Sequence, residues 1–115
     1  MDNELIFNQV CDIILRNRGK LSKPLTGVTT LRKDLGIDGY DAEEIMVEYF
    51  TAFEIDSLQF QFEDYFGPEG SNPFVSIIYL FKKSTLTEIS VGHLVDCVMN
   101  GKWSPPRNQR IILGK

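Results

Sequence analysis

The chain has 115 residues, of which 43% are hydrophobic and 24% charged, and its formal net charge is −4. This length and composition predict one globular domain with a real core and exclude an intrinsically disordered chain. The N-terminus opens with acidic rather than basic residues, and the most apolar run, residues 74–81, is too short to cross a bilayer. We therefore expect a cytoplasmic protein with no secretory signal and no membrane span.

The charges are segregated along the chain. Every charged residue from 16 to 33 is basic, all ten from 34 to 64 are acidic, and the tail from residue 102 onward is basic again. A solvated surface usually mixes both signs, so this segregation predicts a surface that faces a basic partner protein. Because acids repel phosphates, the long acidic block argues against nucleic acid as the main partner.

Residues of the types that carry catalysis or bind metals are scarce. The two cysteines, Cys11 and Cys97, lie in apolar helical patterns, and we expect them to be buried, reduced thiols. A catalytic thiol needs a nearby histidine, and the chain has one histidine, His93. No spacing is typical of a zinc site, and the alternative of a weak calcium site would use Asp34, Asp38 and Asp41. The sequence therefore predicts a protein that is not an enzyme and holds no metal.

The first half of the chain predicts two helices. Apolar residues recur at helical spacing over residues 4–16, so an amphipathic helix is expected there, ending near Gly19. Residues 20–33 have little periodicity and predict a long loop. We expect the second helix to begin with Asp41 as its N-cap, because Asp41 and Glu44 fit a capping box. Its predicted inner face consists of Ile45, Met46, Tyr49, Phe50 and Phe53.

The second half predicts aromatic core residues and two further elements. Residues 55–66 are rich in aromatics that we assign to the core, in a short extended piece followed by one helical turn. Residues 74–81 predict an apolar helix, with a strand as the alternative because of their β-branched residues. Ser90 is the expected N-cap of a last helix that ends at Gly101, after which Trp103 folds back onto the core. The predicted inner face of that helix is Val91, Leu94, Val95, Val98 and Met99.

Residues 31–44, Leu-Arg-Lys-Asp-Leu-Gly-Ile-Asp-Gly-Tyr-Asp-Ala-Glu-Glu, resemble the signature of acyl carrier proteins. In that family Asp-Leu-Gly-x-Asp-Ser-Leu-Asp opens the second helix, and its serine carries the phosphopantetheine arm. Residues 48–55 are similar to the end of that helix, and residues 87–96 are similar to the start of the last carrier helix. Within the family, the chain most closely resembles a group of uncharacterised enterobacterial acyl-carrier-like proteins.

The resemblance implies a fold and a function. The implied fold is all-α, an acyl-carrier-like four-helix bundle over residues 1–104, with the 74–81 helix or strand inserted before the last helix. Residues 105–115 would form a basic C-terminal tail. Gly39 stands where the carrier serine should be, and glycine has no hydroxyl to attack coenzyme A. The likeness therefore implies a non-catalytic interaction module without phosphopantetheine, which binds a basic-surfaced protein.

The implied binding surface lies on helix two. Carried over by position, it comprises Asp38, Asp41, Glu43, Glu44 and Glu48. The alternative function is a genuine carrier modified at Ser57, because Asp56-Ser57-Leu58 repeats part of the signature. We expect a monomer or a weak homodimer, and the apolar residues 74–81 are the alternative site for a dimer or lipid contact.

Overall fold

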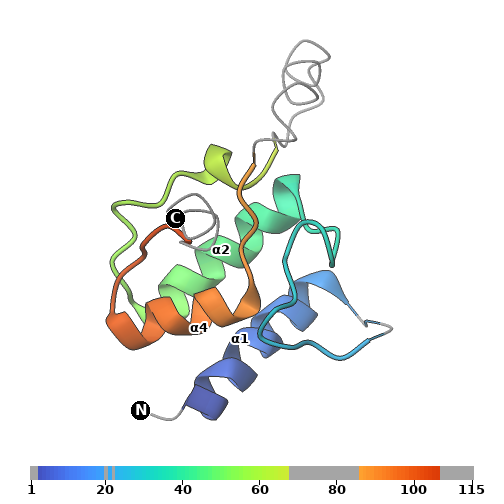
Figure 1. The fold of residues 1–115 in the computed structure, drawn as a ribbon, viewed down its shortest axis with the longest axis horizontal. Helices are drawn as coiled ribbons and strands as arrows, with labels where there is room; N and C mark the ends of the chain where they lie inside the picture. Colours follow the sequence, from blue (N-terminus) through green and yellow to red (C-terminus); the bar gives the residue numbers. More distant parts are fainter. Residues whose placement is uncertain (1–2, 20, 22, 68–85, 107–115) are drawn as a thin grey trace, which may run out of the picture.

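The structure is a computed structural model that describes residues 3–19, 21, 23–67 and 86–106. These ranges contain three α-helices and one 3₁₀ turn: α1 (Asn3–Arg18), α2 (Gly39–Phe53), η1 (Phe62–Asp64) and α4 (Val91–Asn100). The described part of the chain contains no strand, which confirms the predicted helical class in this coarse sense (Figure 1). A four-helix bundle needs one helix more than these three α-helices, and the further helical element in the described ranges is the short η1. The predicted helix or strand at 74–81 lies outside the described residues.

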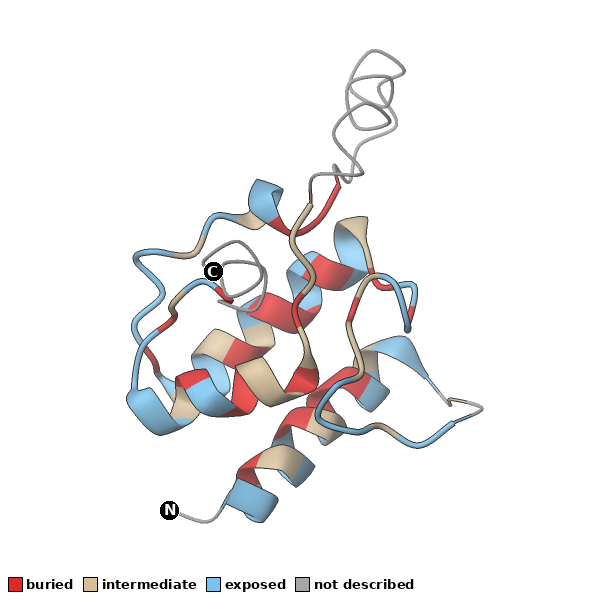
Figure 2. Cartoon of the chain, in the orientation of Figure 1, coloured by how far each residue is buried: buried red, intermediate tan, exposed pale blue. Residues whose placement is uncertain are grey.

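Helix α1 packs against both α2 and α4 (Figure 1). Its buried residues lie at positions 6, 10, 13 and 14, a spacing that places them on one face of a helix. The helix ends as predicted at Gly19, whose φ of +95° suits glycine and whose N–H donates to the Leu15 carbonyl at 2.9 Å. Figure 2 shows that the buried residues lie along the helices where these face one another, with exposed residues on their outer sides.

The predicted long loop after α1 is held by backbone hydrogen bonds to the segment that enters α4. The Leu31 N–H donates to the Ile89 carbonyl and the Val91 N–H to the Thr29 carbonyl, both at 2.9 Å. The Gly92 N–H donates to the Gly27 carbonyl at 2.8 Å, and a Cβ at Gly92 would stand only 2.9 Å from that oxygen. The close approach of the two backbones therefore requires glycine at position 92.

Helix α2 begins at Gly39, and the prediction of Asp41 as its N-cap is wrong. The N-cap is Asp38, which has extended backbone angles and whose Oδ1 accepts from the Gly39 N–H at 3.1 Å. Gly39 has a φ of +58°, a value that glycine adopts without steric cost. This glycine lets the helix begin earlier than the capping box predicted, and Asp41 consequently lies in the first turn.

The inner face of α2 matches the prediction. Its residues Ile45, Met46 and Tyr49 are buried, while Phe50 and Phe53 are half-buried against the core. The Tyr49 hydroxyl donates to the Leu94 carbonyl at 2.6 Å and so ties α2 to α4. Burial raises the pKa of Tyr49 well above its ordinary value, which keeps the phenol protonated.

Trp103 closes the core, as predicted. It is 1% exposed, and its ring packs edge-on against the rings of Phe60 and His93, each with centroids 5.0 Å away. Asp56 fixes the returning chain, because its carbonyl accepts from the Trp103 N–H at 2.7 Å. Tyr65 is buried beside the same indole, so the aromatics of residues 55–66 belong to the core.

The ends of α4 match the prediction, but one residue of its inner face does not. The Ser90 side chain accepts from the His93 N–H at 3.1 Å, and Gly101 ends the helix with a φ of +82°. Met99, expected to point inward, is 44% exposed, whereas Cys97 is 1% exposed. The segment after α4 folds back over the side of the helix that carries Cys97. This side is therefore buried, and Met99 remains exposed.

Candidate functional site

One side of α2 combines exposed acidic and exposed apolar side chains. We call this the α2 outer face, and it consists of Tyr40, Glu43, Glu44, Val47 and Thr51. Their spacing of three and four residues brings them to one side of the helix. Tyr40 is 63% exposed and Val47 is 60% exposed, so this face presents two large hydrophobic side chains to solvent beside its acids. Asn17 of α1 borders the shallow groove along this face.

The two glutamates of the α2 outer face carry negative charge that no ion pair compensates within the described residues. Both are exposed, and no ion pair between described residues includes Glu43 or Glu44. Asp41, one turn nearer the helix start, is exposed as well. These three carboxylates lie near the positive end of the helix dipole, which stabilises them, and their charge remains directed at solvent.

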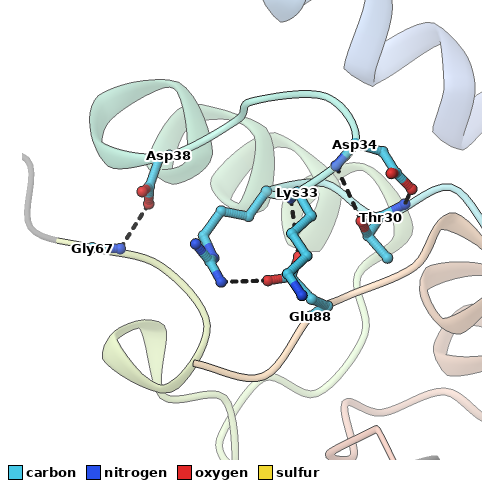
Figure 3. Close-up of polar contacts among 7 residues, drawn as sticks. Thr30, Lys33, Asp34, Asp38, Gly67 and Glu88 are labelled. Atoms are coloured by element: carbon cyan, nitrogen blue, oxygen red, sulfur yellow. Dashed lines mark hydrogen bonds and ion pairs between the residues drawn. The ribbon is translucent and has the colours of Figure 1, made fainter. Parts of the chain in front are cut away.

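Two of the five predicted surface acids have roles within the fold. Asp38 is half-buried, and its Oδ1 accepts from the Gly67 N–H at 2.7 Å as well as capping α2 (Figure 3). Glu48 is half-buried and accepts from Asn17 Nδ2 at 2.9 Å, while its other oxygen pairs with Arg16. The hydrogen bonds from Asn17 and Arg16 lower the pKa of Glu48. Asp38 and Glu48 therefore connect elements, whereas Asp41, Glu43 and Glu44 face solvent.

Gly39, the residue that the acyl-carrier resemblance aligns with the carrier serine, is the first residue of α2. Glycine itself has no hydroxyl, and the neighbouring Tyr40 carries a phenol that is exposed to solvent. Ser57, the alternative attachment residue, is exposed in a turn in which the Leu58 N–H donates to Asp56 Oδ1 at 2.9 Å. No α-helix begins at Ser57, so its surroundings differ from those that the carrier signature implies.

Two of the three acids of the alternative calcium site have other partners, and the third, Asp41, is exposed. Asp34 Oδ2 accepts from the Thr30 N–H at 2.9 Å, and this bond lowers the pKa of Asp34 (Figure 3). Asp38 faces Gly67 instead. Within the described ranges, no three histidine, cysteine or carboxylate side chains come together in a way that could hold a metal.

Beside these acids, an ion pair links the loop before α2 to the segment before α4. Arg32 Nη2 lies 2.5 Å from Glu88 Oε2, and both side chains are mostly buried. The other Glu88 oxygen accepts from the Lys33 N–H at 3.1 Å (Figure 3). Glu88 is thus held by two groups of the opposite segment, which assigns it to the fold rather than to a binding surface.

His93 and Cys97 lie one helical turn apart, and the structure brings them together. His93 Nε2 is 2.7 Å from the Ser104 carbonyl and 3.5 Å from Cys97 Sγ. Because a carbonyl only accepts, Nε2 carries the ring proton and cannot take one from the thiol. Burial lowers the pKa of His93 and raises the pKa of Cys97, so both groups stay neutral. A neutral thiol without an available base is a poor nucleophile.

The sequence interpretation missed the apolar part of the α2 outer face. Tyr40 and Val47 lie outside the predicted inner face of the helix, and this position was the sequence signal that could have indicated their exposure. An apolar residue off the buried stripe of an acidic helix must be exposed unless another element covers it.

A comparison with protein families matches residues 4–104 to a family model described as "Protein of unknown function (DUF1493)". Neither a search of curated proteins nor a search of solved structures returned a match. None of the helices in the described ranges has the length and apolar character that crossing a bilayer requires.

Proposed function

We propose that this chain, which belongs to the DUF1493 family of proteins of unknown function, is a non-catalytic, acyl-carrier-like interaction module. In this proposal the α2 outer face binds a basic-surfaced protein. The observation that carries the proposal is the exposure of Tyr40 and Val47 beside Glu43 and Glu44, two acids that form no ion pair within the described residues.

The apolar and acidic residues would contribute in different ways. Exposed apolar side chains with a polar rim are typical of protein interfaces, and full burial of an aliphatic side chain stabilises a complex by about 1.5–3 kcal/mol. An exposed ion pair contributes only about 0–1 kcal/mol. Val47 and Tyr40 would therefore contribute more per side chain, while the carboxylates together accelerate association with a basic surface, favour it over acidic ones and make the binding depend on salt.

The geometry at Gly39 supports a module without a prosthetic group. Its φ of +58° lies in the left-handed region, where a residue with a side chain costs roughly 1–2 kcal/mol. The helix start therefore favours glycine itself, beyond the loss of a serine hydroxyl. The neutral pair of His93 and Cys97 also agrees with a non-catalytic role.

Affinity capture at two salt concentrations tests the proposal. The purified chain is immobilised and exposed to a lysate of its source cells at about 0.1 M and about 1 M salt, between which the Debye length falls from about 10 Å to about 3 Å. We expect a basic-surfaced protein to be retained at low salt and released at high salt. If every specific partner stays bound at high salt, the proposal is wrong.

A pair of matched variants tests the apolar part of the surface. Val47→Ser removes an exposed apolar side chain from the α2 outer face, and Leu58→Ser removes one from a turn outside it, where Leu58 is 90% exposed. We expect Val47→Ser to reduce retention of the partner and Leu58→Ser to leave it unchanged. Equal retention by both variants would show that Val47 does not contact the partner.

A genuine carrier modified at Ser57 is the competing function, because the Ser57 side chain is exposed within Asp56-Ser57-Leu58. Co-expression with a broad-specificity phosphopantetheinyl transferase, followed by intact mass measurement, separates the two functions. An interaction module keeps its unmodified mass. An added pantetheine mass that disappears in Ser57→Ala would establish the carrier instead.

A further inference from the structure

A second apolar groove lies between the C-terminal half of α1 and the loop that follows it. We call it the basic groove, and its principal lining residues are Cys11, Leu15, Leu21, Lys23, Pro24 and Leu25. Cys11, Leu21 and Leu25 are half-buried against the core, and Leu15 is 40% exposed. The groove therefore presents an apolar floor that remains in contact with solvent.

The loop on one side of this groove carries positive charge, and on the α1 side the acidic Asp12 neighbours the lining residue Cys11. Every charged residue from 16 to 33 is basic. Lys23 lines the groove itself and is exposed, and Arg18 is exposed on the last turn of α1, where its Nε donates to the Leu35 carbonyl at 2.8 Å. The Asp34 carboxylate accepts from the Thr30 N–H and also lies close enough to Lys23 for the lysine charge to lower its pKa. The basic groove thus has the apolar character of the α2 outer face, and Lys23, the charged residue that lines it, has the opposite sign to Glu43 and Glu44.

We propose that the basic groove binds the α2 outer face of a second copy of this chain. Val47 would enter the apolar floor, and Glu43 and Glu44 would face Lys23 and Arg18. The argument rests on charge complementarity, since residues 34–64 contain no basic residue and residues 16–33 no acidic one. It also rests on the proposed function, because it treats the α2 outer face as a docking surface, but it adds a second surface and names the occupant.

The shape of the groove favours a protein surface over a small apolar ligand. Pockets for small molecules bury about 70–90% of the ligand surface. Here Lys23 and Pro24 are exposed and Leu15 is partly exposed, so the groove is open along its length. Two small complementary surfaces of this kind form weak, salt-sensitive contacts, because interfaces below about 1,200 Å² are typical of transient complexes.

The contact joins two different surfaces and therefore allows a sharp mixing experiment. One variant, Leu15→Ser with Lys23→Glu, loses the basic groove and keeps the α2 outer face. The other, Glu43→Lys with Val47→Ser, loses the face and keeps the groove. The wild-type chain is expected to associate in sedimentation velocity as concentration rises at low salt, and to dissociate at high salt. Each variant alone is expected to remain a monomer, and an equimolar mixture is expected to form dimers that do not grow further.

A control variant and a folding measurement keep the test decisive. Val28→Ser changes an 82% exposed residue of the same loop that is not among the groove residues, and its association should equal that of the wild type. All substituted positions are exposed, so the urea midpoints should stay close to that of the wild type. A wild-type chain that is monomeric at every concentration at low salt would overturn the proposal. Association that persists in either single-surface variant, or a mixture that stays monomeric, would overturn it too.

The failure of this inference can be told apart from failure of the proposed function. A monomeric wild-type chain that still captures a basic protein at low salt leaves the proposed function intact and removes the second copy as occupant. Self-association through Glu43 and Val47, without any salt-sensitive capture of another protein, would support this inference and contradict the proposed function. The two experiments therefore report on the two proposals independently.

Discussion

The outer face of α2 and the side of α4 that faces residues 103–104 use their polar residues in opposite ways. On that side of α4, His93 and Cys97 lie beside the Ser104 carbonyl and Trp103 packs against the His93 ring, so the groups most suited to chemistry are held inside. On α2, Glu43 and Glu44 face solvent beside an exposed Val47. The difference shows that residue type alone does not identify a functional site. The partners that a side chain already has within the fold decide what it can still bind.

The largest effect is expected on the side of α4 that faces residues 103–104. Trp103→Ala removes a 1% exposed indole on which several rings pack, and such substitutions cost roughly 3–5 kcal/mol. The free energy of unfolding from urea titration should fall by that amount, or the chain should fail to fold. Leu58→Ala is the control, because Leu58 is 90% exposed and its loss should change stability by less than about 0.5 kcal/mol. Similar losses in both variants would contradict a structural role for Trp103.

A smaller effect is expected at the start of α4. Ser90→Ala removes the side-chain acceptor of the His93 N–H, and the loss of such an N-cap costs about 1 kcal/mol. Ser57→Ala makes the same chemical change in an exposed turn and should be neutral. Urea midpoints of the two variants provide the comparison. A neutral Ser90→Ala would mean that the cap does not stabilise the helix.

The pH dependence of stability tests the His93 contact. Burial lowers the pKa of His93, while the Ser104 carbonyl and the charge of Asp96 oppose the shift. Below the ordinary value of 6.5 the unfolded chain therefore takes up a proton before the folded chain does. This contribution to stability is complete above that pH and is lost as the pH falls toward the lowered pKa.

His93→Gln should remove this part of the pH dependence, because glutamine can donate to Ser104 but does not titrate. Urea midpoints measured between about pH 7.5 and about pH 5.5 cover the range around the ordinary histidine pKa. The wild-type midpoint should fall across this range more than that of His93→Gln. Parallel curves would show that His93 is not buried as a neutral ring.

The smallest change in stability is expected on the α2 outer face. The variant Glu43→Gln, Glu44→Gln, Val47→Ser replaces three exposed side chains, each of which should alter the free energy of unfolding by less than about 0.5 kcal/mol. A urea titration checks this value. A loss comparable to that of Trp103→Ala would show that these side chains stabilise the fold and would remove the contrast between the two regions.

Local sequence signals predicted the elements whose boundaries are set locally. The C-terminal Gly19 of α1 and the Ser90 cap of α4 lie where the sequence placed them. The start of α2 was misplaced, because the capping-box pattern at Asp41 also occurs within the first turn of a helix that begins earlier, and the left-handed conformation of Gly39 allows that earlier start. Met99 was assigned to the wrong face, because the chain that returns after α4 covers the Cys97 side of that helix.

The sequence predicted the exposure of some acids of the candidate site correctly, but not the bonds that others form with distant parts of the chain. Glu43 and Glu44 are exposed, as a surface role requires. Asp38 and Glu48 were assigned the same role, but their partners Gly67 and Asn17 are far away in the sequence, and a local pattern does not reveal such contacts. The exposure of Tyr40 and Val47 was not predicted, because a local sequence pattern does not show whether another element covers an apolar residue outside the buried stripe.

Charge reversal at two matched places tests the central claim most directly. Glu43→Lys with Glu44→Lys changes the α2 outer face, and Glu63→Lys with Asp64→Lys makes the same change in net charge at exposed residues of η1. The affinity of each for the basic protein captured at low salt is measured by calorimetric titration. The proposed function predicts at least a tenfold weaker Kd for the α2 variant, about 1.4 kcal/mol, and little change for the η1 variant. Equal weakening in both, or none in the α2 variant, would contradict it.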